Sequence, residues 1–563
     1  PRQLLGSQND MATIRLPFAA HADQACRGWT AASEKPYVGQ SRKIFKRRAQ
    51  LTFKLQTVTI YLVKNGWRDH GMDRCRQRLR RKMDRLKRRA GREGRCRADL
   101  PAALLLILIL LAQAGMMVHF GQQKQGFHED EMATFELANL PGGFLHLRDG
   151  FLNSWQPGDF FAYPLTVDAE RAFDYSIPYH NQEVDVHPPL YYYVIHTASS
   201  LVPGTFSKWV GIVPNILLCM LAAALLFRIS RKISGSRALG LITAAAWALS
   251  VGAMTTAVFI RMYALLTVCC LLLVLVHLRA YQEAGETGRL RWPTLLTLLA
   301  CTAFGILTQY YFLVFCFFLC GCFFLYLAAS RRWGALLRYA AAEVGAIAVS
   351  VAYFPSMLYH IFSGYRGEQA MENALSGDGY LSHVRTVASI ISRGLFNGWI
   401  FELLLILALL LLIRCVGRLC RPSGSGGGAE AFLDWRREGL PLAALGLTAC
   451  GYILVIARVA PYQVDRYYLC VYPLIVLLMV HGAFAAGKGF LKKRGVLLGL
   501  LAVLFLGVTA LSYQRQTVNY LYPEFAEREE ALSAYEGAKV ICLNGDFAWA
   551  PDRWLTEYRQ YDE

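Results

Sequence analysis

The sequence predicts an all-α polytopic membrane protein with about eleven transmembrane helices and a large first external loop that carries interfacial helices. Of its 563 residues, 55% are hydrophobic and only 18% are charged, and the mean hydropathy is positive. Windows of about 19 residues detect repeated apolar stretches along most of the chain. This composition excludes a disordered chain and an ordinary soluble protein.

The first hundred residues form a separate, basic segment. They contain 25 Lys and Arg against 8 Asp and Glu, and so account for most of the net charge of +19. The block Arg74–Arg97 is typical of a cytoplasmic flank that precedes a membrane span. We expect residues 1–99 to be disordered or translated from upstream of the true start, because the chain begins with Pro1 whereas Met72 and Met83 precede the first span. An RNA-binding arm or a lipid-surface tether is the alternative, although aromatic residues are sparse in this block.

The predicted transmembrane domain covers residues 100–512. The tail 513–563 is expected outside, where its apolar stretch 538–543 predicts a strand of a small domain that is incomplete or truncated. Within the domain, the run Trp292–Ala329 is split at Gln309 because it is long enough to cross twice. The eleven apolar stretches lie near residues 100–119, 209–227, 238–257, 262–278, 293–309, 311–329, 338–358, 399–413, 440–457, 467–487 and 495–512.

The charges of the loops determine the predicted orientation. Five short loops hold 19 Lys and Arg and are placed inside, whereas residues 121–188 have 11 Asp and Glu against 3 Lys and Arg. The amino terminus is therefore expected in the cytoplasm, with external loops at 120–208 and 359–397 and a cytoplasmic linker at 413–438. The apolar stretch 188–202 is interpreted as a helix on the outer surface, because inserting it would reverse every later loop.

Signals for common cofactors are sparse. Most of the 15 cysteines lie within predicted spans or on the inner side, so no structural disulfide is expected. No CxxC pair with a histidine partner supports a zinc site. The run Ser423–Gly428 lacks the Gly-Lys-Ser/Thr ending of a phosphate-binding loop. The sequence predicts no cofactor and no metal ligands, and it leaves open whether a divalent cation assists the reaction.

Unusual polar residues gather on the predicted outer side. They are His128-Glu129-Asp130-Glu131, Asp185-Val186-His187-Pro188-Pro189-Leu190-Tyr191-Tyr192, Arg261-Met262-Tyr263, Gln309-Tyr310-Tyr311, Tyr365-Arg366-Gly367 and Asp465-Arg466-Tyr467-Tyr468. A carboxylate at this boundary can act as general base toward an acceptor hydroxyl, and arginines can hold a phosphate leaving group. A lipid-linked sugar phosphate in the outer leaflet supplies such a leaving group, so no nucleotide site is needed.

In this order the motifs resemble the C-type glycosyltransferase superfamily of integral membrane enzymes, and within it family 39, which contains protein O-mannosyltransferases and aminoarabinose transferases. The resemblance covers roughly residues 100–480, and its most specific parts are Asp130-Glu131, the motif from His187 to Tyr192, and Arg261-Met262-Tyr263. It implies an inverting enzyme of a bacterial plasma membrane that transfers a hexosyl or pentosyl group from a polyprenyl-phosphate donor. The implied acceptor is a hydroxyl or amine of a lipid, polymer or protein, and nucleic acid is not an expected partner.

The resemblance also implies roles for individual residues. Asp130 is the expected catalytic base and Glu131 the second acid, while Glu129 leaves open which carboxylate faces the acceptor. Gln309 stands where this family commonly has a histidine, so no metal or proton role is assigned to it. The expected substrate contacts are His187, Tyr191, Arg261, Tyr263, Tyr310, Arg366 and Arg466.

Several of these residues have a structural alternative. Asp130 is alternatively only the cap of a helix over residues 131–140, and His187 is alternatively part of a rigid turn before the surface helix. Arg261, at a span boundary, is alternatively an arginine that extends to the lipid headgroups.

The remaining candidates have equally simple alternatives. Arg366 lies in a loop that is expected to close over the donor, and alternatively it is only a solvated loop arginine. Arg466 alternatively pairs with Asp465. Tyr310 is alternatively a residue of the aromatic belt at the membrane interface.

Two other classes of function remain open at this stage. A transporter or flippase for a lipid-linked saccharide would also use outer arginines and aromatic residues, and a polymerase or ligase would differ in its oligosaccharide donor. The sequence shows no repeated halves with polar breaks at mid-membrane, which are typical of transporters. The long acidic first loop favours a transferase over both.

Overall fold

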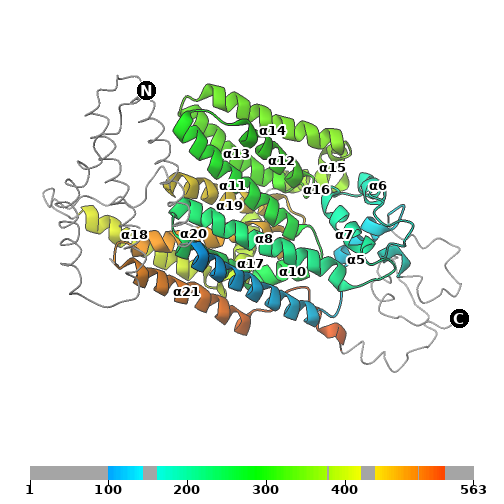
Figure 1. The fold of residues 1–563 in the computed structure, drawn as a ribbon, viewed down its shortest axis with the longest axis horizontal. Helices are drawn as coiled ribbons and strands as arrows, with labels where there is room; N and C mark the ends of the chain where they lie inside the picture. The colour runs from blue at the N-terminus through cyan, green and yellow to red at the C-terminus, as the bar shows by residue number, and fades with distance from the viewer. Residues whose placement is uncertain (1–98, 144–161, 377–378, 420–437, 492, 527–563) are drawn as a thin grey trace, which may run out of the picture. The chain divides into compact units, whose positions relative to one another are not determined.

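The computed structural model describes residues 99–143, 162–376, 379–419, 438–491 and 493–526 (Figure 1). In this part of the chain, all regular secondary structure is helical. The basic segment 1–98, most of the linker 413–438 and the expected strand at 538–543 lie outside the described residues.

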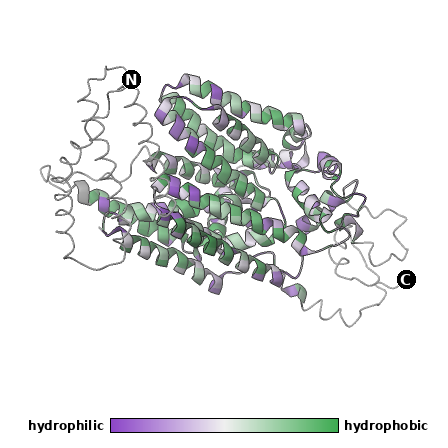
Figure 2. Ribbon diagram, viewed as in Figure 1, coloured by the Kyte–Doolittle hydropathy of each residue, from purple (hydrophilic) through white to green (hydrophobic). Residues whose placement is uncertain are grey.

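Eight helices are long and apolar enough to cross a membrane, and Figure 2 shows hydrophobic residues along most of their length. They are Asp99–Gln123, α8 (Lys208–Ser234), α11 (Tyr263–Thr287), α13 (Phe312–Ala329), α14 (Trp333–Tyr353), α19 (Leu440–Val459), the segment Leu469–Gly487, which joins η4 (Leu469–Val471) to α20 (Tyr472–Gly487), and α21 (Arg494–Arg515). The predicted class, an all-α polytopic membrane protein, is thus confirmed.

The predicted count of eleven spans is not confirmed, because the structure supports eight, or up to ten if bent helix pairs are included. One pair is α9 (Arg237–Ala248) and α10 (Val251–Val258), bent by 57°, and the other is α17 (Tyr380–Phe396) and α18 (Ile400–Leu419), bent by 84°. The one remaining stretch of the eleven, 293–309, forms α12 (Trp292–Ile306). Its 15 residues extend only about 22 Å, less than the roughly 30 Å of a hydrocarbon core. Hydropathy located these helices except α17, but could not detect the bends.

Short helices gather at one end of the bundle (Figure 1). Here α5 (Glu129–Asn139) packs against α6 (Ser176–Val184), α7 (Leu190–Ser200) and η1 (Tyr163–Leu165). The side chain of Asn139 donates hydrogen bonds to the Leu165 carbonyl oxygen (2.8 Å) and to Ser199 Oγ (3.0 Å), which ties α5 to η1 and α7. With 11 residues, α7 is too short to cross a membrane, as expected for the stretch 188–202.

The segment 359–397, expected as an external loop, is mostly helical. It contains most of α15 (Met357–Phe362) and all of α16 (Tyr365–Ser376) and α17. The sequence window missed α17 because its buried residues Val387, Ile391 and Leu395 recur every fourth position among polar residues, which lowers the average hydropathy. This helix packs against α19 and α21.

The junction between α10 and α11 is held in a defined conformation by α8. Asn215 of α8 donates from its amide group to the carbonyl oxygens of Ala257 (3.3 Å), in the last turn of α10, and of Phe259 (2.8 Å), just beyond its end. Gly211, one turn earlier on α8, has no room for a side chain, because an added Cβ would lie 2.1 Å from Ile260 Cγ2. The structure therefore fixes the segment that carries Arg261.

Candidate active site

Asp130 lies in the first turn of α5, and His128 caps this helix. The His128 ring accepts a hydrogen bond from the Asp130 backbone N–H (Nδ1 to N, 3.0 Å), and the Glu131 carboxylate accepts one from the His128 backbone N–H (2.7 Å). These two bonds form a capping box around His128. The alternative that Asp130 is merely the helix cap is therefore wrong, and its carboxylate is left for other contacts.

Glu131 is fully buried and its oxygens are occupied by the protein. Oε2 forms an ion pair with Lys124 Nζ at 2.9 Å, and both side chains have 0% exposure. Oε1 accepts a hydrogen bond from the Ile260 backbone N–H at 2.7 Å. Glu131 thus connects the chain after the first helix, α5 and the α10–α11 junction, whereas Glu129 is exposed.

The Asp130 carboxylate pairs with an arginine that is far away in the sequence. Arg466 Nη2 lies 3.2 Å from Asp130 Oδ2, and Arg466 Nη1 lies 3.2 Å from His128 Nε2. Arg466 is in η3 (Asp465–Tyr467) and does not pair with the adjacent acid, because Asp465 accepts hydrogen bonds from Tyr520 Oη and the Asn519 amide. The Asp130 side chain remains 31% exposed, so it is accessible to a ligand.

Arg261 is buried behind Asp130, so the alternative of a lipid-facing arginine is wrong. With only 4% exposure, it donates from Nη1 to the Asp130 carbonyl oxygen (3.2 Å), Thr134 Oγ1 (2.7 Å) and Tyr192 Oη (3.1 Å). Its Nη2 lies 3.3 Å from His187 Nε2, and its buried Nε has no hydrogen-bond partner within the described ranges. Arg261 therefore places a full positive charge beside the start of α5.

His187 connects Arg261 to a second carboxylate. Its Nδ1 lies 3.0 Å from Asp185 Oδ2. The neutral ring with its proton on Nδ1 donates to Asp185 and leaves Nε2 as the acceptor for Arg261. Pro189 precedes α7 as its N-terminal cap residue, so the predicted turn before the surface helix is present, and it places His187 in the site.

The local charges shift the acidity of both carboxyl groups. Burial alone would raise the pKa of Asp130, but the positive charges of Arg261 and Arg466 outweigh it, so the pKa lies below its ordinary value. Burial also opposes ionisation of Asp185, whose pKa is nevertheless lowered by the hydrogen bond from His187. Both groups are therefore ionised at neutral pH.

Two of the other expected substrate contacts line the site or support it. Tyr263, the first residue of α11, stacks on Phe259 at 5.9 Å between ring centroids and contacts Tyr467 at 6.5 Å. Tyr191 is completely buried and donates its hydroxyl to Asn215 Oδ1 at 3.1 Å. Tyr191 thus supports the α10–α11 junction through α8.

The two remaining candidates form hydrogen bonds with residues other than those described above. The hydroxyl of Tyr310 lies 2.9 Å from His360 Nδ1. Arg366 donates to Gln369 Oε1 at 2.9 Å and lies over the ring of Tyr365. The structure therefore brings together Asp130, His187, Arg261, Tyr263 and Arg466, and gives Tyr310 and Arg366 other hydrogen-bond partners.

Sequence reasoning did not select several residues that complete the site. Asp185 and Tyr192 are the two ends of the motif from Asp185 to Tyr192, but neither was selected. Thr134 follows Asp130 by one helical turn, so helical spacing could have indicated it. Tyr520 follows the last span without any pattern, yet its ring stacks on Phe259 at 4.0 Å. Only the fold could have revealed Tyr520.

Together these contacts define a polytopic helical membrane protein in which a partly exposed carboxylate lies beside two arginines at one end of the bundle. Residues 186–360 match the family model described as dolichyl-phosphate-mannose-protein mannosyltransferase. This match confirms the resemblance to the C-type glycosyltransferase superfamily. No curated protein matches the chain.

Two solved structures are similar to this chain, both of ArnT from Cupriavidus metallidurans. The structure bound to undecaprenyl phosphate is 12% identical with a TM-score of 0.46, and the match covers 81% of this chain and 85% of that chain. The structure in the apo state is 13% identical with a TM-score of 0.46, and the match covers 82% and 85% of the two chains.

Proposed function

We propose that this chain is a membrane glycosyltransferase that moves a sugar from a polyprenyl-phosphate donor to an acceptor hydroxyl or amine, with Asp130 as general base. The observation that carries the proposal is the ion pair between Asp130 and Arg466, with Arg261 buried directly behind it. A base and phosphate-binding cations are the two groups that such a transfer requires. The family match over residues 186–360, whose description names a dolichyl-phosphate-linked sugar, supports the same donor class.

Donor binding changes the partners of Arg466. The phosphate of the donor presents several anionic oxygens to a guanidinium group, so it competes with the single Oδ2 contact of Asp130. Once Arg466 turns toward the phosphate, the charge that lowers the pKa of Asp130 is shared with another anion, while burial continues to raise that pKa. Asp130 therefore becomes a stronger base when the donor is present.

In the transfer step, the acceptor oxygen or nitrogen attacks the anomeric carbon from the face opposite the phosphate. Its proton passes to Asp130, a new glycosidic bond forms, and the bond to the phosphate oxygen breaks with its electron pair on the polyprenyl phosphate. Arg466 and Arg261 stabilise the charge that develops on the leaving phosphate, and the product has inverted configuration. His187 and Asp185 hold Arg261 in place during this step.

The proposed reaction occurs on the outer face of a bacterial plasma membrane, with the amino terminus inside. The acidic residues of 121–188 and the Lys and Arg of the opposite loops support this orientation. The short helices α5 and α7 lie at one end of the bundle, where a headgroup in the outer leaflet can reach Asp130 (Figure 1).

The proposal is tested by comparing the sugar composition of envelope lipids, polymers and proteins from cells that express variants at equal membrane levels. Asp130→Asn should remove one sugar modification, whereas Glu129→Gln, which changes the exposed neighbouring carboxylate, should retain it. Equal profiles for wild type and Asp130→Asn, both different from empty cells, would exclude Asp130 as the base. If none of the profiles differs from empty cells, transport of a lipid-linked saccharide becomes the better explanation.

A further inference from the structure

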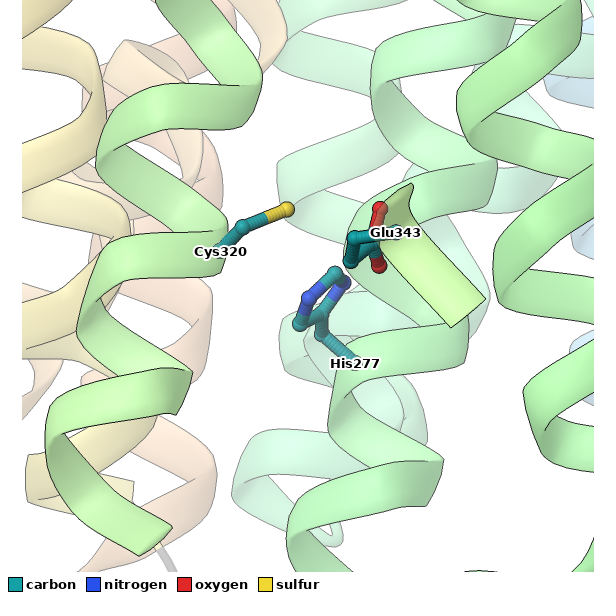
Figure 3. Close-up of side chains that lie close together, drawn as sticks. All are labelled: His277, Cys320 and Glu343. Carbon is teal, nitrogen blue, oxygen red and sulfur yellow. The ribbon is translucent and has the colours of Figure 1, made fainter. Parts of the chain in front are cut away.

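A second group of reactive side chains lies inside the bundle, away from Asp130. His277 of α11, Cys320 of α13 and Glu343 of α14 point toward one another, and each offers one ligand atom within 4.8 Å of the others (Figure 3). His277 is 14 residues along α11 from Tyr263, which corresponds to about 21 Å along the helix axis. This His–Cys–Glu cluster is therefore separate from the candidate active site.

The ionised Glu343 side chain is energetically unfavourable at its position unless a cation balances its charge. It occupies the middle of the apolar helix α14, where an ionised carboxylate is strongly unfavourable. Its Oε2 accepts a hydrogen bond from Thr302 Oγ1 at 2.8 Å, but its buried Oε1 has no hydrogen-bond partner among the residues described. An unpartnered oxygen aimed into a cluster with His277 and Cys320 indicates a missing positive ligand.

His277 is held in the tautomer that binds a metal. Its Nδ1 lies 2.9 Å from the Leu273 carbonyl oxygen, which can only accept, so Nδ1 carries the proton. The lone pair on Nε2 faces the cluster and now contacts the Tyr339 hydroxyl at 2.9 Å. A backbone carbonyl that orients the ring in this way is typical of histidine ligands in metal sites.

We propose that His277, Cys320 and Glu343 bind one Zn²⁺ ion, with the Tyr339 hydroxyl or a water molecule in the fourth position. A thiolate and a carboxylate together carry two negative charges, so a divalent cation makes the site neutral, as its low-dielectric surroundings require. Nitrogen and sulfur ligands favour zinc over calcium or magnesium.

The geometry permits this site with small movements. Tetrahedral zinc bonds of about 2.0 to 2.3 Å place ligand atoms roughly 3.5 Å apart, so atoms now within 4.8 Å must approach by about 1 Å. A cavity of about 530 Å³ borders Cys320, Tyr339 and Glu343, so these side chains have space to adjust. Binding displaces the protons of the thiol and the carboxyl group, and links α11, α13 and α14.

The test uses the full chain purified without a metal-affinity tag, with zinc measured by elemental analysis after incubation with zinc chloride and removal of free ion. We expect about one zinc per chain in the wild type and at least about a tenfold loss of affinity in Cys320→Ser and Glu343→Gln. Cys322→Ser is the matched control, because it lies on the same helix but outside the cluster, and it should bind zinc like the wild type.

A cobalt(II) absorption spectrum provides a second readout, and its result for the wild-type chain does not depend on the stability of any variant. A thiolate-to-metal band should appear in the wild-type chain and in Cys322→Ser, and be lost in Cys320→Ser. Absence of bound zinc and of this band in the wild type would overturn the proposal, as would equal zinc content in Cys320→Ser and Cys322→Ser. Neither measurement depends on glycosyl transfer, so the outcome is independent of the proposed function.

Discussion

The sharpest prediction concerns Glu131, which the sequence suggests as a second catalytic acid and the structure shows as the partner of buried Lys124. Glu131→Gln removes the carboxylate that pairs with the Lys124 ammonium group at a position where both side chains have 0% exposure. Removing one partner of a buried ion pair costs about 3–5 kcal/mol. We therefore expect the free energy of unfolding to fall by that amount, together with loss of the bond that Oε1 accepts from the Ile260 N–H.

The assay is thermal unfolding of the purified protein in detergent, followed beside transferase activity per folded molecule. Asp130→Asn is the matched comparison, because it changes a partly exposed carboxylate on the same turn and should abolish activity with little loss of stability. The double variant Lys124→Met with Glu131→Gln should recover part of the stability, since it removes both members of the buried ion pair.

The reasoning about Glu131 is refuted by one clear result. If Glu131→Gln unfolds at the same temperature as the wild type but has no activity, Glu131 acts in the reaction and is not a positioning residue. If instead it is less stable yet retains activity in its folded fraction, the assignment to positioning is supported.

Three further variants probe the same site. Arg466→Gln should move the acid limb of the activity–pH profile to higher pH. The active ionised form of Asp130 exists only above its pKa, and loss of this arginine raises that pKa. An acid limb that stays at the same pH would contradict the ion pair. Thr134→Val removes a charged hydrogen bond to Arg261 and should lower kcat/KM for the donor about tenfold in steady-state kinetics. Gly211→Ala forces a Cβ against Ile260 and should lower the free energy of unfolding by about 1–3 kcal/mol. An unchanged melting temperature would show that the α10–α11 junction can move to make room.

Much of this architecture follows from local sequence pattern. Long apolar runs determine membrane helices because every backbone polar group in a bilayer must be satisfied within its own helix. The eleven stretches accordingly all fall on helices, and the stretch 188–202 forms the short helix α7. The acidic cluster at Asp130 and the arginine at 261 were also recognisable, because charged residues are unusual beside such apolar segments.

Hydropathy could not determine where helices bend. The break between α9 and α10 depends on Ser250, whose side chain accepts a hydrogen bond from the Ala253 N–H and starts a new helix inside an apolar stretch. A window average does not respond to one capping residue. The predicted count of eleven spans is therefore not confirmed, and the helices within 359–397 were not predicted.

The sequence by itself determined the class of protein and the side chains available for chemistry, whereas only the tertiary structure decided their partners. Asp130 and Arg466 are separated by more than 300 residues yet lie 3.2 Å apart, and Glu131 turned out to be occupied by Lys124. The cluster of His277, Cys320 and Glu343 likewise draws on three helices and has no local spacing motif. Local sequence encodes helix formation and burial, but contacts between distant residues arise from how the helices pack, which no short window of sequence records.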